Sequence, residues 1–292
     1  MNAASIRAIL VTILTCLSFS TWETDAKPPV FPKSNALHMD VYHGYLLVVD
    51  ASIGPLHGLR FLLDTGATHT TIDRKLAQKL GLALRPDELI SFDKIVRIDS
   101  ARLPELSYGP EYFSDVPVVV QDMRYFLTIG LRVDGIIGWD LLKTGSFRLD
   151  LAKKQVSFGP TSPLSGSSVP LQPEAPFLTV QVDLDGQPVS MIADTGLFGT
   201  ALYEGAVENA RESYNVLGRA MGQSVGGAVK SKSVLVPRLR LGNQDLDREV
   251  QLIERPSSNP LPGIAGYLGI SALDAKQISF DFEHNQLRWS KK

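Results

Sequence analysis

Short hydrophobic or alternating segments, separated by turn residues, recur along most of the chain. In the first half they are residues 42–53, 59–64, 115–121, 146–151 and 155–159, and in the second half 176–184, 188–194, 233–241, 249–254, 277–282 and 286–290. Segments of this length and composition are typical of β-strands. Apolar residues at helical spacing occur in few places, namely 71–82, 139–143, 202–214 and 271–276. The pattern therefore predicts an all-β protein with short helices.

The chain also repeats itself once. FLLDTGATHT, which contains Asp64, matches SMIADTGLFGT, which contains Asp194, 130 residues later. GIIGWDLLKTGSFRLDLAKKQVSFG matches GYLGISALDAKQISFDFEHNQLRWS, with Gly138 and Gly269 131 residues apart. Between these, LPELSYGPEYFSDVPVVVQD resembles VPRLRLGNQDLDREVQLIE. Matches in the same order at nearly the same offset indicate two copies of one unit of about 125 residues.

The segment between the two copies predicts the domain boundaries. Residues 159–170, GPTSPLSGSSVP, are rich in Gly, Pro and Ser, which is typical of an exposed linker. We therefore expect a first lobe at residues 27–158 and a second lobe at residues 171–292.

Residues 1–26 are predicted to be a signal peptide. Arg7 precedes an apolar run that is too short for a comfortable membrane span, and Ala26 stands at a plausible cleavage position. An uncleaved anchor is the alternative, whereas a lipoprotein is disfavoured because the residues before Cys16 are not small. Cleavage would remove the only cysteine, which favours export to a bacterial periplasm, or secretion, without disulfides. No other segment could span a bilayer, so we expect no stable membrane insertion after cleavage.

The overall charge excludes some classes of partner. The formal net charge is −2, so neither nucleic acid nor an anionic membrane surface is expected as the main partner. A chain of 292 residues, 44% of them hydrophobic, is long enough to bury a substantial core without help from disulfides.

Asp64 and Asp194 are the candidate catalytic residues. Each follows an apolar strand and precedes a glycine that is followed by threonine four residues later, and they lie 74 and 75 residues before Gly138 and Gly269. A single Asp-Thr-Gly would be an ordinary turn, but duplication in register favours a function. Two copies joined by a linker are expected to pair about a pseudo-two-fold axis, as homodimers do. That arrangement would place the two aspartates side by side.

Two carboxyls in contact cannot both be ionised, so they are expected to share one proton. Such a pair can hold a water, take its proton as it attacks a carbonyl carbon, and donate a proton to the carbonyl oxygen. This chemistry needs no metal and no cofactor. We expect the hydroxyls of Thr65 and Thr195 to brace one loop against the other. Gly66 and Gly196 are expected to allow tight turns beside the carboxyls.

The motifs resemble those of a known family. Asp-Thr-Gly-Ala at 64–67, a threonine three residues after the alanine, and Ile-Ile-Gly at 136–138 resemble the retropepsin-like aspartic proteases. The duplication resembles the bilobal pepsin-like pattern, in the smaller form of bacterial single-chain relatives. The resemblance implies two homologous β-barrel lobes with a cleft between them, and an endopeptidase that cuts a peptide or protein substrate with Asp64 and Asp194, favoured by acid pH. Since the pair is internal, we expect a monomer.

The sequence also departs from this family pattern. Leu197 follows the second Asp-Thr-Gly, where the family usually has a small residue. Residues 222–236 resemble a glycine-tipped flap hairpin, whose candidate tip residues are Ser224, Val225, Gly226 and Gly227, but residues 88–103 of the first copy have no glycine at the tip. The alternative is therefore a catalytically weak or inactive module that binds a peptide or polymer on the same bilobal fold.

Three other features have ordinary structural interpretations. Residues 222–226 match Gly-x-Ser-x-Gly, but a nucleophile elbow needs a following helix and a strand-like segment follows here, so Ser224 is disfavoured as a nucleophile. His69 has no second histidine or cysteine at ligand spacing and is interpreted as a loop residue at the rim of the site. Asp150 and Asp281 also repeat between the copies, and we expect them to stabilise turns.

Overall fold

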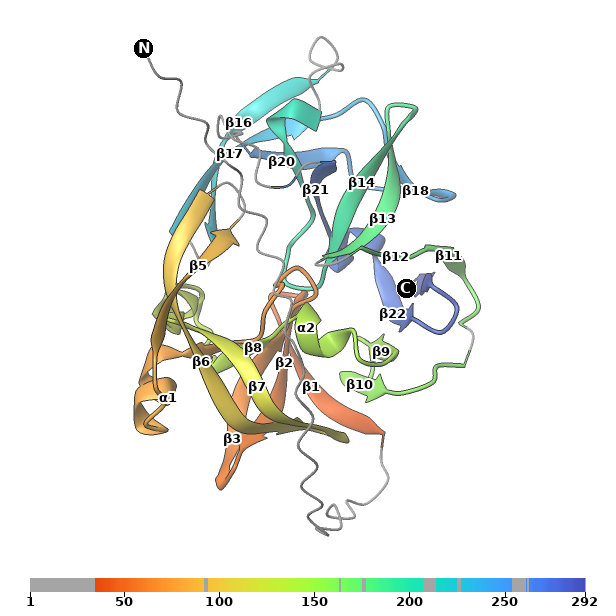
Figure 1. Cartoon of the computed structure of the whole chain (residues 1–292). Helices are drawn as coiled ribbons and strands as arrows, with labels where there is room; N and C mark the ends of the chain where they lie inside the picture. Colours follow the sequence, from red (N-terminus) through yellow and green to blue (C-terminus); the bar gives the residue numbers. More distant parts are fainter. Residues whose placement is uncertain are drawn as a thin grey trace, which may run out of the picture. The chain divides into compact units, whose positions relative to one another are not determined.

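The computed structural model describes residues 35–91, 94–162, 164–174, 177–206, 214–224, 227–253, 261 and 263–291. Two predictions fall outside these residues, namely the signal peptide at 1–26 and the flap residues Val225 and Gly226. In the described part of the chain, strands dominate and helices are short, which confirms the fold class that the hydrophobic pattern predicts (Figure 1). None of the helices in those ranges has the length and apolar character needed to cross a membrane.

The first copy contains ten strands among its described residues. They are β1 (Ala36–Tyr42), β2 (Leu46–Ile53), β3 (Leu56–Leu63), β4 (Thr71–Asp73), β5 (Arg85–Ser91), β6 (Lys94–Tyr108), β7 (Glu111–Gln121), β8 (Gly135–Ile137), β9 (Phe147–Asp150) and β10 (Gln155–Phe158). Its helices are α1 (Arg74–Lys79), the 3₁₀ helix η1 (Met123–Ile129) and α2 (Trp139–Leu142).

The second copy and the segment before it supply the remaining strands. They are β11 (Ser167–Pro170), β12 (Gln172–Glu174), β13 (Phe177–Leu184), β14 (Gln187–Asp194), β15 (Thr200–Tyr203), β16 (Asn215–Ser224), β17 (Gly227–Leu235), β18 (Leu239–Leu241), β19 (Gln244–Asp245), β20 (Glu249–Ile253), β21 (Ile264–Gly269), β22 (Ala275–Asp281) and β23 (Gln286–Lys291). The 3₁₀ helix η3 (Ile270–Leu273) follows β21.

Equivalent strands pair in the same way in both copies. β3 runs parallel to β8, β8 is antiparallel to β4, and β4 is parallel to β7. In the second copy, β14, β21, β15 and β20 repeat these three relations. Their interior positions are buried hydrophobic residues, as expected for strands covered on both faces. Each aspartate stands where the strand before it ends, on a rigid and buried base.

The predicted helices are shorter than the sequence pattern suggests. In the range 71–82, the first three residues pair with β8 and β7 as strand β4, and α1 begins only after Asp73, whose side chain accepts a hydrogen bond from the backbone N–H of Lys75. In the range 202–214, Leu202 and Tyr203 belong to β15, and residues 207–213 are not described. Pairing of buried strands overrides helical propensity here.

Both copies carry a two-stranded hairpin at the expected flap position. β5 and β6 pair antiparallel in the first copy, and β16 and β17 do so in the second. Ser224 lies opposite Gly227 at the described end of the second hairpin. The next described element after Ser224 is the strand β17 and not a helix, which argues against a nucleophile elbow.

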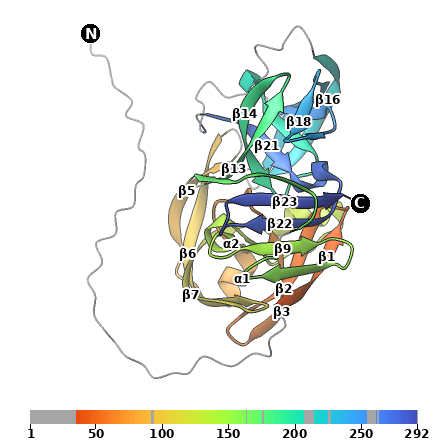
Figure 2. The ribbon, with the colours of Figure 1, turned by 90° about the vertical axis from the view of Figure 1, so that its right-hand side faces the viewer.

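One sheet joins the two copies in a way that the sequence did not predict. β22 of the second copy pairs with β9 of the first, and β23 pairs with β11, so the last four residues of the predicted linker are a strand (Figure 2). Phe147 and Phe280 lie opposite each other across this junction, both buried, with their rings stacked 4.5 Å apart. One buried core cluster contains residues of both copies.

We predict that Phe280→Ala destabilises the whole protein and not only the second copy. Removing a fully buried aromatic ring from a packed core costs about 3–5 kcal/mol. Because the ring stacks on Phe147 of the first copy, urea unfolding followed by circular dichroism should remain a single transition, shifted as a whole. Tyr112→Ala, which removes an exposed ring, is the control and should change stability by less than about 0.5 kcal/mol. Two separate transitions, only one of them shifted, would contradict this prediction.

Candidate active site

Asp64 directly follows β3 and Asp194 is the last residue of β14, and the loops that continue from the two aspartates meet each other (Figure 1). The backbone N–H of Asp64 donates to the carbonyl of Ile137 at 3.0 Å, which continues the pairing of β3 with β8. In the second copy, Asp194 pairs with Gly269 at the end of β14 and β21. The buried strands therefore fix the backbone from which each carboxyl projects.

Four hydrogen bonds between Thr65 and Thr195 and their surroundings hold the two loops together. The backbone N–H of Thr65 donates to Oγ1 of Thr195 at 3.0 Å, and the N–H of Thr195 donates to Oγ1 of Thr65 at 3.1 Å. Each hydroxyl in turn donates across the interface, from Thr65 to the carbonyl of Ala193 at 2.7 Å and from Thr195 to that of Leu63 at 2.8 Å. Both threonines are 1% exposed. The predicted bracing role fits these contacts.

The glycines of the two motifs lie against the carboxyl of the opposite copy. A Cβ atom on Gly66 would overlap the carboxyl of Asp194, and one on Gly196 would lie 2.6 Å from Oδ2 of Asp64. Neither glycine has a positive φ. Glycine is therefore needed for close approach between the copies and not for a left-handed turn. The arrangement brings the two carboxyls into hydrogen-bonding contact.

Each carboxylate also accepts hydrogen bonds from its own loop. Oδ1 of Asp64 accepts from the backbone N–H of Gly66 at 2.9 Å and of Ala67 at 3.0 Å, and Oδ1 of Asp194 accepts from that of Gly196 at 2.7 Å. Burial raises the pKa of both aspartates, and the neighbouring charge of Asp64 raises that of Asp194 further. The contacts between the carboxyls and with the backbone oppose this rise at Asp64. The pair therefore retains one shared proton at pH values above the usual aspartate pKa.

The pair is partly open to solvent. Asp64 is half-buried, whereas Asp194 is 6% exposed. Three tyrosine hydroxyls lie close to the carboxyl pair, those of Tyr45, Tyr125 and Tyr267. Burial raises the pKa of each hydroxyl, and the negative charge of the nearby aspartates raises it further. Phenols held in the neutral form can donate hydrogen bonds and add no negative charge beside the pair.

Two equivalent segments, Ile-Ile-Gly at 136–138 and Tyr-Leu-Gly at 267–269, pack against the aspartate loops. A Cβ atom on Gly138 would lie 2.5 Å from the carbonyl carbon of His69, and one on Gly269 would overlap the carbonyl of Leu197. The backbone N–H of Gly138 donates to Oγ1 of Thr70 at 3.1 Å. Here glycine permits two backbones to touch.

Asp140 and Ser271 support these loops, although the sequence did not single them out. Asp140 accepts hydrogen bonds from the N–H and hydroxyl of Thr70, both at 2.8 Å. At the equivalent place, Oγ of Ser271 accepts from the N–H of Gly199 at 2.7 Å. Both residues stand two positions after the repeated glycine, so comparing the copies position by position would have found them.

The bulky Leu197 points into the second copy. It is partly buried against a hydrophobic cluster that includes Ile192, Tyr203 and Tyr267. Much of this side chain is thus accommodated within its own copy. The next residue, Phe198, is 66% exposed and was not singled out by the sequence, although it lies inside the repeated motif.

The other residues considered from the sequence lie in ordinary structural positions. Asp150 accepts from the N–H of Lys153 at 2.9 Å and Asp281 from that of His284 at 3.1 Å, which is the expected turn role. His69 is exposed, and its Nδ1 lies 2.8 Å from Oγ1 of the adjacent threonine. Among the described residues, no three or more histidine, cysteine or acidic side chains gather in a way that could hold a metal ion.

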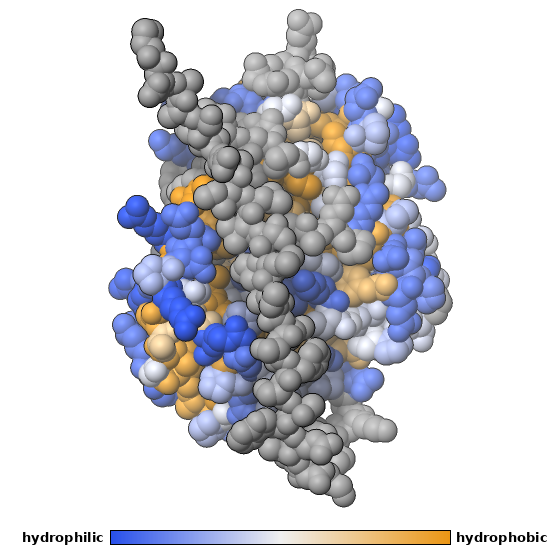
Figure 3. All heavy atoms as spheres, viewed as in Figure 1, coloured by the Kyte–Doolittle hydropathy of each residue, from blue (hydrophilic) through white to orange (hydrophobic). Residues whose placement is uncertain are grey.

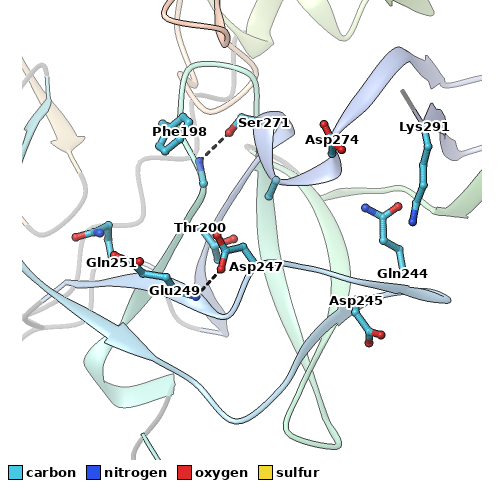
Figure 4. A pocket seen from close by; sticks show the side chains of 12 residues that line it. Phe198, Thr200, Gln244, Asp245, Asp247, Glu249, Gln251, Ser271, Asp274 and Lys291 are labelled. Atoms are coloured by element: carbon cyan, nitrogen blue, oxygen red, sulfur yellow. Dashed lines mark hydrogen bonds between the residues drawn. The ribbon is translucent and has the colours of Figure 1, made fainter. Parts of the chain in front are cut away.

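A polar cavity of about 550 Å³ adjoins the second aspartate loop (Figure 4). Its lining includes Phe198, Thr200 and Ser271, together with the acidic side chains Asp245, Asp247, Glu249 and Asp274. Neither Asp64 nor Asp194 lines it. It is therefore separate from the carboxyl pair, although it shares the loop that carries Phe198.

We predict that Thr195→Val weakens the contact between the copies. The change leaves the N–H of Thr65 and the carbonyl of Leu63 without the partner they have now, and each buried unsatisfied group costs about 1–3 kcal/mol. Urea unfolding should register this loss. Thr195→Ser keeps the hydroxyl and should lose about 1 kcal/mol or less, the value of one buried methyl. Equal losses in the two variants would contradict a role for these hydrogen bonds.

Comparison with known proteins agrees with this geometry. The sequence model that describes the aspartyl protease family matches the chain twice, at residues 49–141 and 180–272. Each match contains one aspartate, the strand before it and the glycine segment that packs against its loop. No curated protein sequence shows significant similarity to the chain. The two matches together cover more than half of the chain, which therefore belongs to the aspartyl protease family as two copies of its domain.

Proposed function

We propose that this chain is an aspartic endopeptidase in which Asp64 and Asp194 activate a water between them. The observation that carries the proposal is the reciprocal approach of the two motifs, in which each glycine lies against the carboxyl of the other copy. Membership of the aspartyl protease family supports a protease-type function. Asp64 is only half-buried, so water and a peptide can reach its carboxyl group.

The proposed mechanism starts with one proton on the pair. Asp64 carries the charge, because it is the more exposed of the two carboxyls, and Asp194, which is only 6% exposed, carries the proton. Asp64 takes a proton from the water as the water oxygen bonds to the peptide carbonyl carbon, and Asp194 donates its proton to the carbonyl oxygen. Asp64 then donates its newly acquired proton to the amide nitrogen as the C–N bond breaks, while a hydroxyl of the tetrahedral intermediate returns its proton to Asp194 and becomes the carbonyl of the new carboxyl group. The carboxyl and amine products leave, and the pair again holds one proton.

The cellular setting is part of the same proposal. We propose that residues 1–26 direct export to a bacterial periplasm or out of the cell, on the basis of the sequence pattern alone. The mature chain would comprise the lobes at 27–158 and 171–292 joined by 159–170. It would act as a monomer, because both carboxyls come from one chain.

We predict that Asp64→Asn and Asp194→Asn each lower kcat by about 10²- to 10⁴-fold, the usual contribution of a general acid or base. Turnover of a mixed peptide library, followed by mass spectrometry, measures the loss. Asp150→Asn, which alters a repeated aspartate in a turn, is the matched control and should leave the cleavage chemistry intact.

Two results would count against the proposed mechanism. Full turnover by either variant at the pair would exclude it. Wild-type protein that binds peptides but cuts none between pH 3 and pH 8 would instead favour the binding module.

We predict that activity and stability both decline as the pH rises from acid towards neutral. Because burial raises the pKa of both carboxyls, the folded chain holds a proton that the unfolded chain has already released. The contribution of the pair to the free energy of unfolding is therefore most favourable at low pH. It decreases as the pH rises from the unfolded-state pKa through the folded-state pKa. The same deprotonation removes the acid that the reaction needs, so kcat/KM should decline over the same pH range.

Paired measurements test this prediction. Urea unfolding of wild type and Asp194→Asn across the pH range should show wild type losing stability relative to the variant as the pH rises. A pH–rate profile of the wild type should fall in the same window. If wild type and Asp194→Asn showed the same dependence of stability on pH, or if activity increased towards neutral pH, the assignment of a proton to the carboxyl pair would be wrong.

A further inference from the structure

The two aspartate loops have the same framework but different side chains beside it. At the positions that follow each Asp-Thr-Gly, the first copy has Ala67, Thr68 and His69, whereas the second has Leu197, Phe198 and then glycine. The strands below the loops pair in the same parallel arrangement in both copies. The asymmetry is therefore concentrated in the side chains that flank the carboxyls.

Phe198 is unusual in its exposure. Among the described residues it is the most exposed large hydrophobic side chain, at 66%. On the face shown in Figure 3, hydrophobic areas are scattered among hydrophilic residues. Phe198 differs from these scattered hydrophobic residues, because it lies only four positions after Asp194, a candidate catalytic residue.

The ring of Phe198 is supported from the other copy. Its centroid lies 5.4 Å from that of Tyr45, with the ring planes inclined at 55°. Tyr45 lies between β1 and β2 of the first copy and packs on a cluster of buried residues that includes Leu46 and Phe126. Its hydroxyl is near enough to Asp194 for the carboxylate to raise its pKa, after burial. The two rings therefore form an aromatic surface that connects the second aspartate loop to a hydrophobic cluster of the first copy.

The equivalent place in the first copy is polar. Oγ1 of Thr68 lies 2.8 Å from Nδ1 of His69, and the imidazole is exposed. A peptide lying across the carboxyls would thus meet an apolar ring on one flank and a hydroxyl with an imidazole on the other. Because the two flanks differ, a peptide bound in one chain direction makes different contacts from the same peptide bound in the reverse direction.

We propose that Phe198, supported by Tyr45, is a specificity-determining residue that binds an aromatic or large aliphatic side chain of the peptide on one flank of the scissile bond only. Ring-to-ring packing in edge or offset geometry stabilises such a contact beyond the area that it buries. The proposal rests on the proposed function, since it requires that peptides bind across Asp64 and Asp194.

The first experiment measures cleavage preference. A peptide library is digested with wild type, with Phe198→Thr, which copies the first loop, and with Thr68→Phe, which copies the second. Phe198→Thr should lower kcat/KM about tenfold for peptides with a large apolar residue at one position and leave other positions unchanged. Thr68→Phe should add an apolar preference on the opposite flank. Tyr112→Thr, which removes an exposed ring from β7, should leave the profile unchanged.

A second experiment separates this inference from the proposed reaction. Asp64→Asn protein, with and without Phe198→Thr, captures peptides from the same library without cutting them, and sequencing of the bound peptides gives the preference. Urea midpoints verify that each variant is folded. Loss of one apolar preference with Phe198→Thr supports the inference even if wild type cuts nothing, a result that would count only against the proposed reaction. If proteins with and without Phe198→Thr showed identical side-chain preferences, in cleavage or in capture, the proposed role of Phe198 would be wrong.

Discussion

The reciprocal hydrogen bonds of Thr65 and Thr195 are the interaction on which the rest of the site depends. Each threonine receives the backbone N–H of the other and donates its hydroxyl to a carbonyl at the end of a strand in the other copy. These bonds are buried, so water does not compete for them. They force two carboxyls into contact, which is unfavourable unless a proton is shared. The raised pKa of the pair is thus a consequence of how the copies are joined.

Duplication within one chain allows the two halves of such a site to differ. The braced loops and the strands beneath them are alike, because any change there would disturb the contact between the carboxyls. Asp140 and Ser271 already show a limited divergence, since each supports its loop with a different oxygen. Farther out, Phe198 and Thr68 differ completely. A symmetric assembly of two identical chains has no such freedom, because every substitution appears on both sides.

The sequence predicted that the two aspartates lie together, but it did not predict how the copies are joined. Asp64 and Asp194 stood out because the motif recurs in register, and the buried strands before them follow from the local hydrophobic pattern. The helix expected at 202–214 failed at Leu202 and Tyr203, where pairing with β20 and β21 decides the structure. The contact of Tyr45 with Phe198 and the pairing of β22 with β9 link residues far apart in sequence. Local periodicity carries no information about such contacts, which depend on how two folded units fit together.

The shared sheet has a consequence for the order of folding. β9 of the first copy finds a neighbour in β22, about 130 residues later, and β11 finds its own in β23. The portion of the chain that is synthesised first therefore leaves one edge of its sheet unpaired until nearly all of the protein has been made. Contacts of such long sequence separation slow folding, because a large loop must close before they form. The sheet that joins the two copies is thus completed only when nearly the whole chain is available.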